Sequence, residues 1–164
     1  AKPSLVDNLG YGTIRPDVMI TAKRGATLYG GPGRDRLEAL GFRSAVFGGV
    51  GADTIVLGLR GSVADGGTGD DTIVAMGRSA LLLVGGLGND TLIGPYGSAL
   101  INAYDGKGGD TVVCRSAMTR VMADAGDSIS GPCKTVPVAT ANDPGATAPG
   151  DQIASRVATS QTTG

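Results

Sequence analysis

A six-residue pattern, G-G-x-G-x-D, returns along this chain at an interval of about 18 residues. Four copies keep every fixed position, and a fifth has an aspartate in place of the first glycine. The copies occupy residues 30–35, 48–53, 66–71, 85–90 and 105–110. The closing aspartate extends one period further each way, giving a column of Asp17, Asp35, Asp53, Asp71, Asp90, Asp110 and Asp127 at spacings of 18, 18, 18, 19, 20 and 17. Each period is therefore one structural unit that stacks on the next.

Each aspartate precedes a short segment with the alternation of a β-strand. The residue two places on is aliphatic in every period, as in Ile55 and Ile73, and the residue between is most often threonine. A different turn and a second apolar segment fill the rest of the period. Two strands and two turns in 18 residues predict an all-β chain, a flattened parallel solenoid of about six to seven coils.

A left-handed hexapeptide helix also has 18 residues per coil and is the alternative solenoid. Stepping by six from Leu57 meets Val63, Gly69, Ala75 and Leu81, but a one-residue insertion then breaks the register. Since the hexapeptide repeat leaves the aspartate column unexplained, the two-strand coil is the preferred prediction.

Composition narrows the classes of function. The chain has 29 glycines in 164 residues and no histidine, which removes the usual general base and most zinc sites. Fourteen Lys and Arg against 15 Asp and Glu give no general attraction to nucleic acid. The longest apolar run, residues 80–84, is far shorter than a membrane span. We therefore expect a protein that is not an enzyme, with no nucleic-acid partner and no membrane span.

The repeated turn has the chemistry of a site for a hard cation. Stacked coils bring carboxylates about 4.8 Å apart, where the repulsion of each adjacent pair is roughly 3 to 4 kcal/mol at an effective dielectric constant near 20. A cation held by carboxylate and carbonyl oxygens would remove that repulsion. An oxygen-only donor set favours calcium over transition metals. Metal-free Gly–Asp turns remain the alternative.

The segments G-G-x-G-x-D followed by Thr-Ile-Val or Thr-Leu-Ile resemble the RTX, or haemolysin-type, calcium-binding nonapeptide repeat. The resemblance implies a right-handed parallel β-roll, or β-helix solenoid, with Ca²⁺ bound between turns of successive coils. The implied carboxylate ligands are Asp35, Asp53, Asp71, Asp90 and Asp110. The implied turn glycines are Gly31, Gly33, Gly49, Gly51, Gly67, Gly69, Gly86, Gly88, Gly106 and Gly108.

The chain departs from the family pattern in one respect. The motif stands in every second nonapeptide, so we expect a single calcium-binding edge with four sites between successive aspartates from Asp35 to Asp110. The longer interval from Asp90 to Asp110 is expected to distort the last of these sites.

The only two cysteines, Cys114 and Cys133, lie 19 residues apart near the end of the repeats. A disulfide between them would stabilise a thin-cored chain and indicates an oxidising compartment, and two reduced thiols are the alternative. Because calcium is abundant outside the cell, we expect a secreted or cell-surface protein.

Two further columns suggest binding surfaces. The first is formed by arginines at the turns without the motif, which could bind an anionic surface glycan or could simply be solvated. These arginines are Arg24, Arg43, Arg60 and Arg78.

The second is a threonine column, which could order water as in ice-binding solenoids, although threonine is also a good strand former. Its members are Thr54, Thr72, Thr91 and Thr111.

The boundaries follow from where the pattern begins and ends. Residues 1–13 are expected to cap the first coil, residues 14–134 to form the roll, and the Ala, Thr and Pro-rich residues 135–164 to be a disordered tail or linker. The sequence thus predicts a calcium-stabilised structural or adhesive module that supports a neighbouring domain. The alternative is a glycan-binding module attached to a secreted carbohydrate-active or hydrolytic enzyme.

Overall fold

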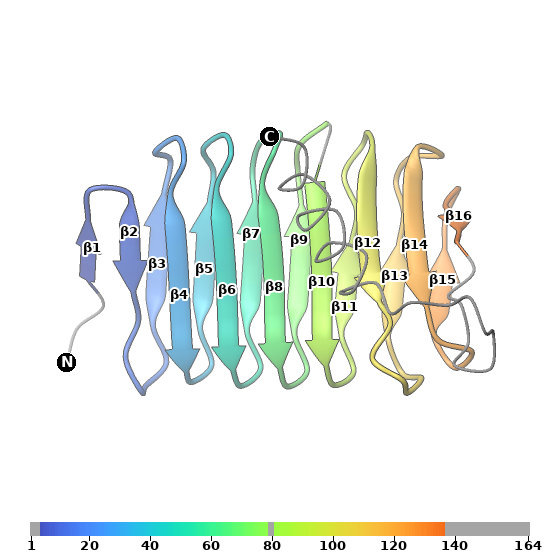
Figure 1. The fold of residues 1–164 in the computed structure, drawn as a ribbon, viewed down its shortest axis with the longest axis horizontal. Helices are drawn as coiled ribbons and strands as arrows, with labels where there is room; N and C mark the ends of the chain where they lie inside the picture. The colour runs from blue at the N-terminus through green and yellow to red at the C-terminus, as the bar shows by residue number, and fades with distance from the viewer. Residues whose placement is uncertain (1–3, 79–80, 137–164) are drawn as a thin grey trace, which may run out of the picture.

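The computed structural model describes residues 4–78 and 81–136, and all regular structure in that part of the chain is β-strand. The strands form two sheets that face each other and run along one long axis (Figure 1). The nine-stranded sheet contains β1 (Ser4–Val6), β2 (Leu9–Tyr11), β4 (Thr27–Pro32), β6 (Ala45–Val50), β8 (Val63–Thr68), β10 (Leu81–Leu87), β12 (Ala99–Ala103), β14 (Thr119–Ala123) and β16 (Lys134–Thr135). The seven-stranded sheet contains β3 (Val18–Thr21), β5 (Arg36–Ala39), β7 (Thr54–Leu57), β9 (Thr72–Ala75), β11 (Thr91–Ile93), β13 (Thr111–Val113) and β15 (Ser128–Ser130).

Successive coils pair in parallel and in register. Thr54 lies opposite Thr72 and Ile55 opposite Ile73, so each sequence column becomes a row of neighbours along the solenoid axis. Only the first pair, β1 with β2, is antiparallel among the described strands. The predicted parallel β-solenoid of about seven 18-residue turns is confirmed, and each coil has two strands, as the preferred prediction required. No described helix could span a membrane.

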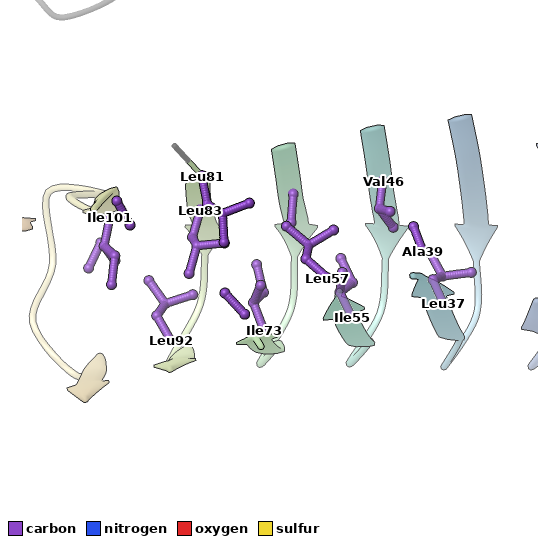
Figure 2. Close-up of a cluster of buried hydrophobic side chains, with 14 of the residues drawn as sticks. Leu37, Ala39, Val46, Ile55, Leu57, Ile73, Leu81, Leu83, Leu92 and Ile101 are labelled. Atoms are coloured by element: carbon purple, nitrogen blue, oxygen red, sulfur yellow. The ribbon is translucent and has the colours of Figure 1, made fainter. Parts of the chain in front are cut away.

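The core is a thin aliphatic layer between the two sheets (Figure 2). The coil that starts at β7 contributes only Ile55, Leu57 and Ala64, all fully buried. Burying a Leu or Ile side chain contributes about 1.5–3 kcal/mol, whereas ordering the backbone costs about 1–2 kcal/mol per residue. One coil therefore cannot be stable alone, and stability comes from stacking.

The aromatic residues lie outside this core. Tyr11, Tyr29 and Phe47 stack on the outer face of the nine-stranded sheet, with ring centroids 5.3 and 5.0 Å apart. The sequence analysis did not anticipate this ladder. It follows from the in-register pairing of β2, β4 and β6, which places equivalent outward side chains one strand spacing apart.

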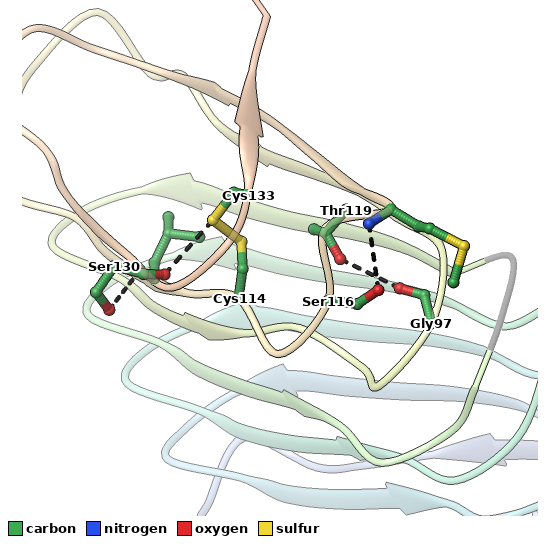
Figure 3. Close-up of a disulfide and its surroundings, with 8 residues drawn as sticks. Gly97, Cys114, Ser116, Thr119, Ser130 and Cys133 are labelled. Carbon is green, nitrogen blue, oxygen red and sulfur yellow. Dashed lines mark hydrogen bonds between the residues drawn. A yellow bond between two sulfur atoms is a disulfide. The ribbon is translucent and has the colours of Figure 1, made fainter.

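Each end of the solenoid has its own closure. At the N-terminus the β1–β2 hairpin extends the nine-stranded sheet, in the segment predicted to be a cap. At the C-terminus Cys114 and Cys133 form the predicted disulfide, which joins the end of β13 to the segment before β16 (Figure 3). The predicted tail lies outside the described residues from position 137 onward.

Candidate metal centre

The G-G-x-G-x-D turns lie side by side along the lower edge in Figure 1, where strands of the nine-stranded sheet pass into the other sheet. Gly51 has a φ of 130°, and a Cβ there would overlap the carbonyl oxygen of Gly33 in the preceding coil. Only glycine permits both the backbone conformation and the close stacking. The turn glycines with φ between 93° and 151° are Gly31, Gly33, Gly49, Gly51, Gly67, Gly69, Gly86 and Gly88.

The five predicted ligand aspartates point into these turns and are at most 2% exposed. In each of them Oδ1 accepts a hydrogen bond from the backbone N–H of the corresponding aspartate one coil earlier, at 2.7–2.8 Å. Asp71, for example, accepts from Asp53 and donates its own N–H to Asp90. The aspartate column is therefore a continuous ladder in which each carboxylate uses one oxygen to join neighbouring coils.

The second carboxylate oxygen has a different environment. Oδ2 is buried and has no hydrogen-bond partner in the five residues Asp35, Asp53, Asp71, Asp90 and Asp110. At the ends of the column the same atom is satisfied, in Asp17 by the N–H of Thr13 and in Asp127 by the N–H of Asp124. Burying such an oxygen without a hydrogen-bond partner lowers the stability of the folded state, because the oxygen loses its hydration and gains no replacement.

The Oδ2 atoms of Asp35, Asp53 and Asp71 lie close to a backbone carbonyl oxygen of the next coil. A Cβ at Gly48 would lie 2.5 Å from Oδ2 of Asp53 and would also overlap the carbonyl oxygen of Gly66. Gly30 has the same relation to Asp35 and Gly48. The missing side chain of the first motif glycine thus leaves a small space bordered by a free carboxylate oxygen and a carbonyl oxygen.

Burial makes the charged form of these side chains unfavourable. It raises the pKa of Asp71 from 3.8 to about 7, and that of Asp53 and Asp110 to about 6, with a smaller contribution from neighbouring carboxylates. Burial also raises the pKa of Asp35 and of Asp90. The one ion pair among the described residues, Arg36 with Glu38, lies away from this ladder on β5, so no protein cation neutralises it.

The donor set fits calcium. The polar atoms that border the space are oxygens, and Ca²⁺ binds carboxylate and carbonyl oxygens in flexible geometry. No group of three or more His, Cys, Asp or Glu side chains converges on one point in the described part of the chain, so backbone oxygens would have to complete the coordination. The five aspartates would each supply Oδ2, and an ion there would supply the missing positive charge.

The last turn departs from the others. Gly106 has a positive φ of 86°, but the second left-handed residue is Gly109, with φ 141°, instead of the predicted Gly108. Asp105 and Asp124 also take part, since Oδ2 of Asp124 accepts the N–H groups of Asp105 and Gly106 at 3.0 and 2.9 Å. Asp124 was not among the residues predicted from the sequence, although its position three residues before Asp127 could have indicated it.

The opposite edge closes its turns without carboxylates. Buried Ser44 and Ser62 each donate a hydroxyl hydrogen bond to the carbonyl three residues earlier, at 3.3 and 3.0 Å. The four arginines singled out above are all exposed on this edge. They do not form one column: the N–H of Gly25 bonds to Phe42 and that of Arg43 to Arg60, so Phe42 stands between Arg24 and Arg60, with Arg43 one position further on.

Comparison with known proteins identifies the repeats that form the edge with the G-G-x-G-x-D turns. A family model for the RTX calcium-binding nonapeptide repeat matches in four copies over residues 29–59, 62–77 and 82–94. These segments are RTX calcium-binding repeats. Neither the curated proteins nor the solved structures that were compared with the chain produced a match.

The RTX match includes four of the five aspartates that have a free Oδ2. The fifth, Asp110, lies beyond residue 94, yet its Oδ1 bonds to Asp90 and its Oδ2 is free as in the matched repeats. The RTX-like ladder therefore continues one coil past the matched segments.

Proposed function

We propose that this chain is a secreted, non-catalytic RTX module whose solenoid is completed by calcium ions along the aspartate edge. The five buried Oδ2 atoms without partners support this proposal most directly, because a cation would satisfy them. Those of Asp35, Asp53 and Asp71 also lie near a carbonyl oxygen of the next coil. The ligands we propose are Asp35, Asp53, Asp71, Asp90 and Asp110, together with carbonyl oxygens of the turn glycines.

Calcium binding would be coupled to folding and would raise the free energy of unfolding. An ion that binds the stacked turns but not the unfolded chain stabilises the fold in proportion to the logarithm of its concentration above the dissociation constant. Without the ion, the ladder must keep its carboxylates protonated or bear their mutual repulsion. The module would thus be rigid where calcium is abundant.

The disulfide and the calcium requirement support the same location. Disulfides persist in oxidising compartments, and extracellular calcium modules bind at about 10⁻⁴–10⁻³ M. Both conditions hold outside the cell, so we infer that the module supports, displays or connects a neighbouring domain there.

Removing calcium tests the proposal. Thermal unfolding of the wild-type protein, followed by circular dichroism, should shift down by more than about 10 °C in EGTA, because several sites are lost together. Calcium added back should restore the transition, and magnesium at the same concentration should restore it only in part, since Mg²⁺ demands stricter geometry. An identical melting curve with and without calcium would refute the proposed function.

A further inference from the structure

The edge opposite the RTX turns has a shallow groove lined by arginines, by the ring of Phe42 and by aliphatic side chains. One stretch is lined by Arg24, Phe42, Arg43 and Arg60, and the adjoining stretch by Phe42, Leu59, Arg60, Met76 and Arg78. The N–H of Tyr96 bonds to the carbonyl of Gly77, so Tyr96 stands next to Arg78 in the following coil. At about 4.8 Å per coil, the groove extends about 14 Å from Arg24 to Arg78, and Tyr96 lies one coil beyond its end.

The charge of this edge is mostly positive. Its turns from residue 22 onward, at residues 22–26, 40–45, 58–62, 76–78, 94–98 and 114–118, contain Lys23 and five arginines and no aspartate or glutamate. The β1–β2 turn at the same edge adds one acidic residue, Asp7, beside Lys23. Among the side chains of these arginines, only that of Arg115 has a partner in the described part of the chain: it lies over the ring of Tyr96 at 5.0 Å and donates a hydrogen bond to the carbonyl of Ala75. The near-zero net charge of the chain therefore conceals an acidic edge and a basic edge.

Arg43 has a left-handed backbone conformation at a position where the neighbouring coils have glycine. Its φ is 55°, and the equivalent residues one coil earlier and later are Gly25 and Gly61, with φ of 70° and 76°. A non-glycine residue in the left-handed region costs roughly 1–2 kcal/mol. The turn thus bears strain that a glycine would relieve, and the strained side chain lines the groove.

We propose that this groove binds a linear polysaccharide whose sugars bear carboxylates. Arginine presents a planar fork that pairs with a carboxylate through two hydrogen bonds, and the groove arginines, whose side chains have no partner among the described residues, could do so. The exposed rings of Phe42 and Tyr96 offer apolar faces to the C–H side of a sugar ring. Arginines on successive coils suit a polymer with charges at regular intervals. This inference goes beyond the calcium role of the other edge.

Single-stranded nucleic acid is the other polyanion that combines charge with rings. Its successive bases stack on successive aromatic side chains. Phe42 and Tyr96 are three coils apart, about 14 Å, with two arginines between them. That spacing does not suit stacked neighbouring bases, so the groove favours the sugar polymer.

Binding can be measured by titration calorimetry on the calcium-loaded protein with short galacturonate oligomers. The wild type should bind them, and their neutral methyl esters should bind at least about tenfold more weakly, because the arginine pairing is lost. R60Q/R78Q should weaken binding by about tenfold or more. A matched double variant, R36Q/R120Q, removes two exposed arginines outside the groove and should stay within about twofold of the wild type.

A second variant separates binding from folding. R43G should melt at the wild-type temperature or above in calcium, because glycine relieves the strained φ, yet it should bind the galacturonate oligomers several-fold more weakly. The proposal is overturned if the oligomers do not bind, if R36Q/R120Q loses as much affinity as R60Q/R78Q, or if a sulfated oligosaccharide or a DNA strand of equal charge binds more tightly. None of these outcomes depends on whether EGTA lowers the melting temperature.

Discussion

At the scale of single residues, each ladder aspartate has two oxygens with separate tasks. Oδ1 of Asp71 holds the amide of Asp53 at 2.7 Å, which any oxygen acceptor of that shape could do. Oδ2 is buried without a partner and gives the side chain its raised pKa. Structure and metal affinity therefore depend on different atoms of one side chain, and a substitution can change them separately.

Asp71→Asn makes that separation measurable. Asparagine keeps an oxygen for the Asp53 amide and removes the charge, so in EGTA the variant should melt at or above the wild-type temperature. In calcium it should lose several °C of the metal-induced gain, at about 2–4 °C per kcal/mol for a chain of this size. Asp17→Asn, at a position whose Oδ2 already has the Thr13 amide, is the control and should leave the calcium gain unchanged. Equal losses in both variants would contradict the ligand assignment.

At the scale of elements, the coil is the unit, and the two turns of one coil are built differently. The motif turn stacks carboxylates that need an external cation, whereas the other turn is closed by serine hydroxyls that find their acceptors locally. The last coil is less well supported than the others. Its strands are short, with three residues in β15 and two in β16, and its core residue Ile129 is only partly buried. Besides the pairing of these short strands, the Cys114–Cys133 disulfide joins it to the preceding coil.

We expect the double variant C114S/C133S to lose its last coil selectively. A disulfide that closes a loop of this length stabilises by about 3 kcal/mol, more than the short β15 and β16 can replace. Hydrogen exchange should show faster amide exchange in residues 128–135, with β7 and β9 unchanged. Uniformly faster exchange along the whole chain would show instead that the disulfide supports the entire solenoid.

At the scale of the whole molecule, the two edges have opposite charge. The acidic edge contains the buried ladder, and the basic edge contains exposed arginines that have no acidic neighbours in the turn sequences. Calcium would neutralise one edge and leave the other unchanged. The molecule would then present a single charged, cationic edge to its surroundings.

The ladder also predicts how stability depends on pH without metal. In the folded protein the pKa of Asp71 is about 7 and that of Asp53 and Asp110 about 6, whereas the ordinary pKa of an aspartate is 3.8. Between pH 3.8 and these raised pKa values, the folded protein therefore binds more protons than the unfolded chain. This contribution is fully present below 3.8 and is lost as the pH rises through 6 to 7.

The protein freed of calcium by dialysis should therefore melt at a higher temperature near pH 5 than near pH 8. With saturating calcium the gain from the metal should be larger near pH 8, because protons compete for the same oxygens. Scanning calorimetry in the two buffers measures both. A metal-free melting temperature that rises from pH 5 to pH 8 would contradict the raised pKa values.

The spacing of the repeats predicted the solenoid, its period and the aspartate column, because a stacked repeat turns spacing along the chain directly into position along the axis. The two cysteines predicted the disulfide, with two reduced thiols as the alternative. Gly109, Asp124 and the ring ladder of Tyr11, Tyr29 and Phe47 were not foreseen. The intervals of 18 residues also imply that Phe42, and not Arg43, stands between Arg24 and Arg60, as the hydrogen bonds between these coils show. The folded coils alone reveal that Oδ1 binds the preceding amide and leaves Oδ2 buried and free. The reason is that this division of the carboxylate depends on hydrogen bonds between coils, and the spacing of residues along the chain does not encode which oxygen accepts them.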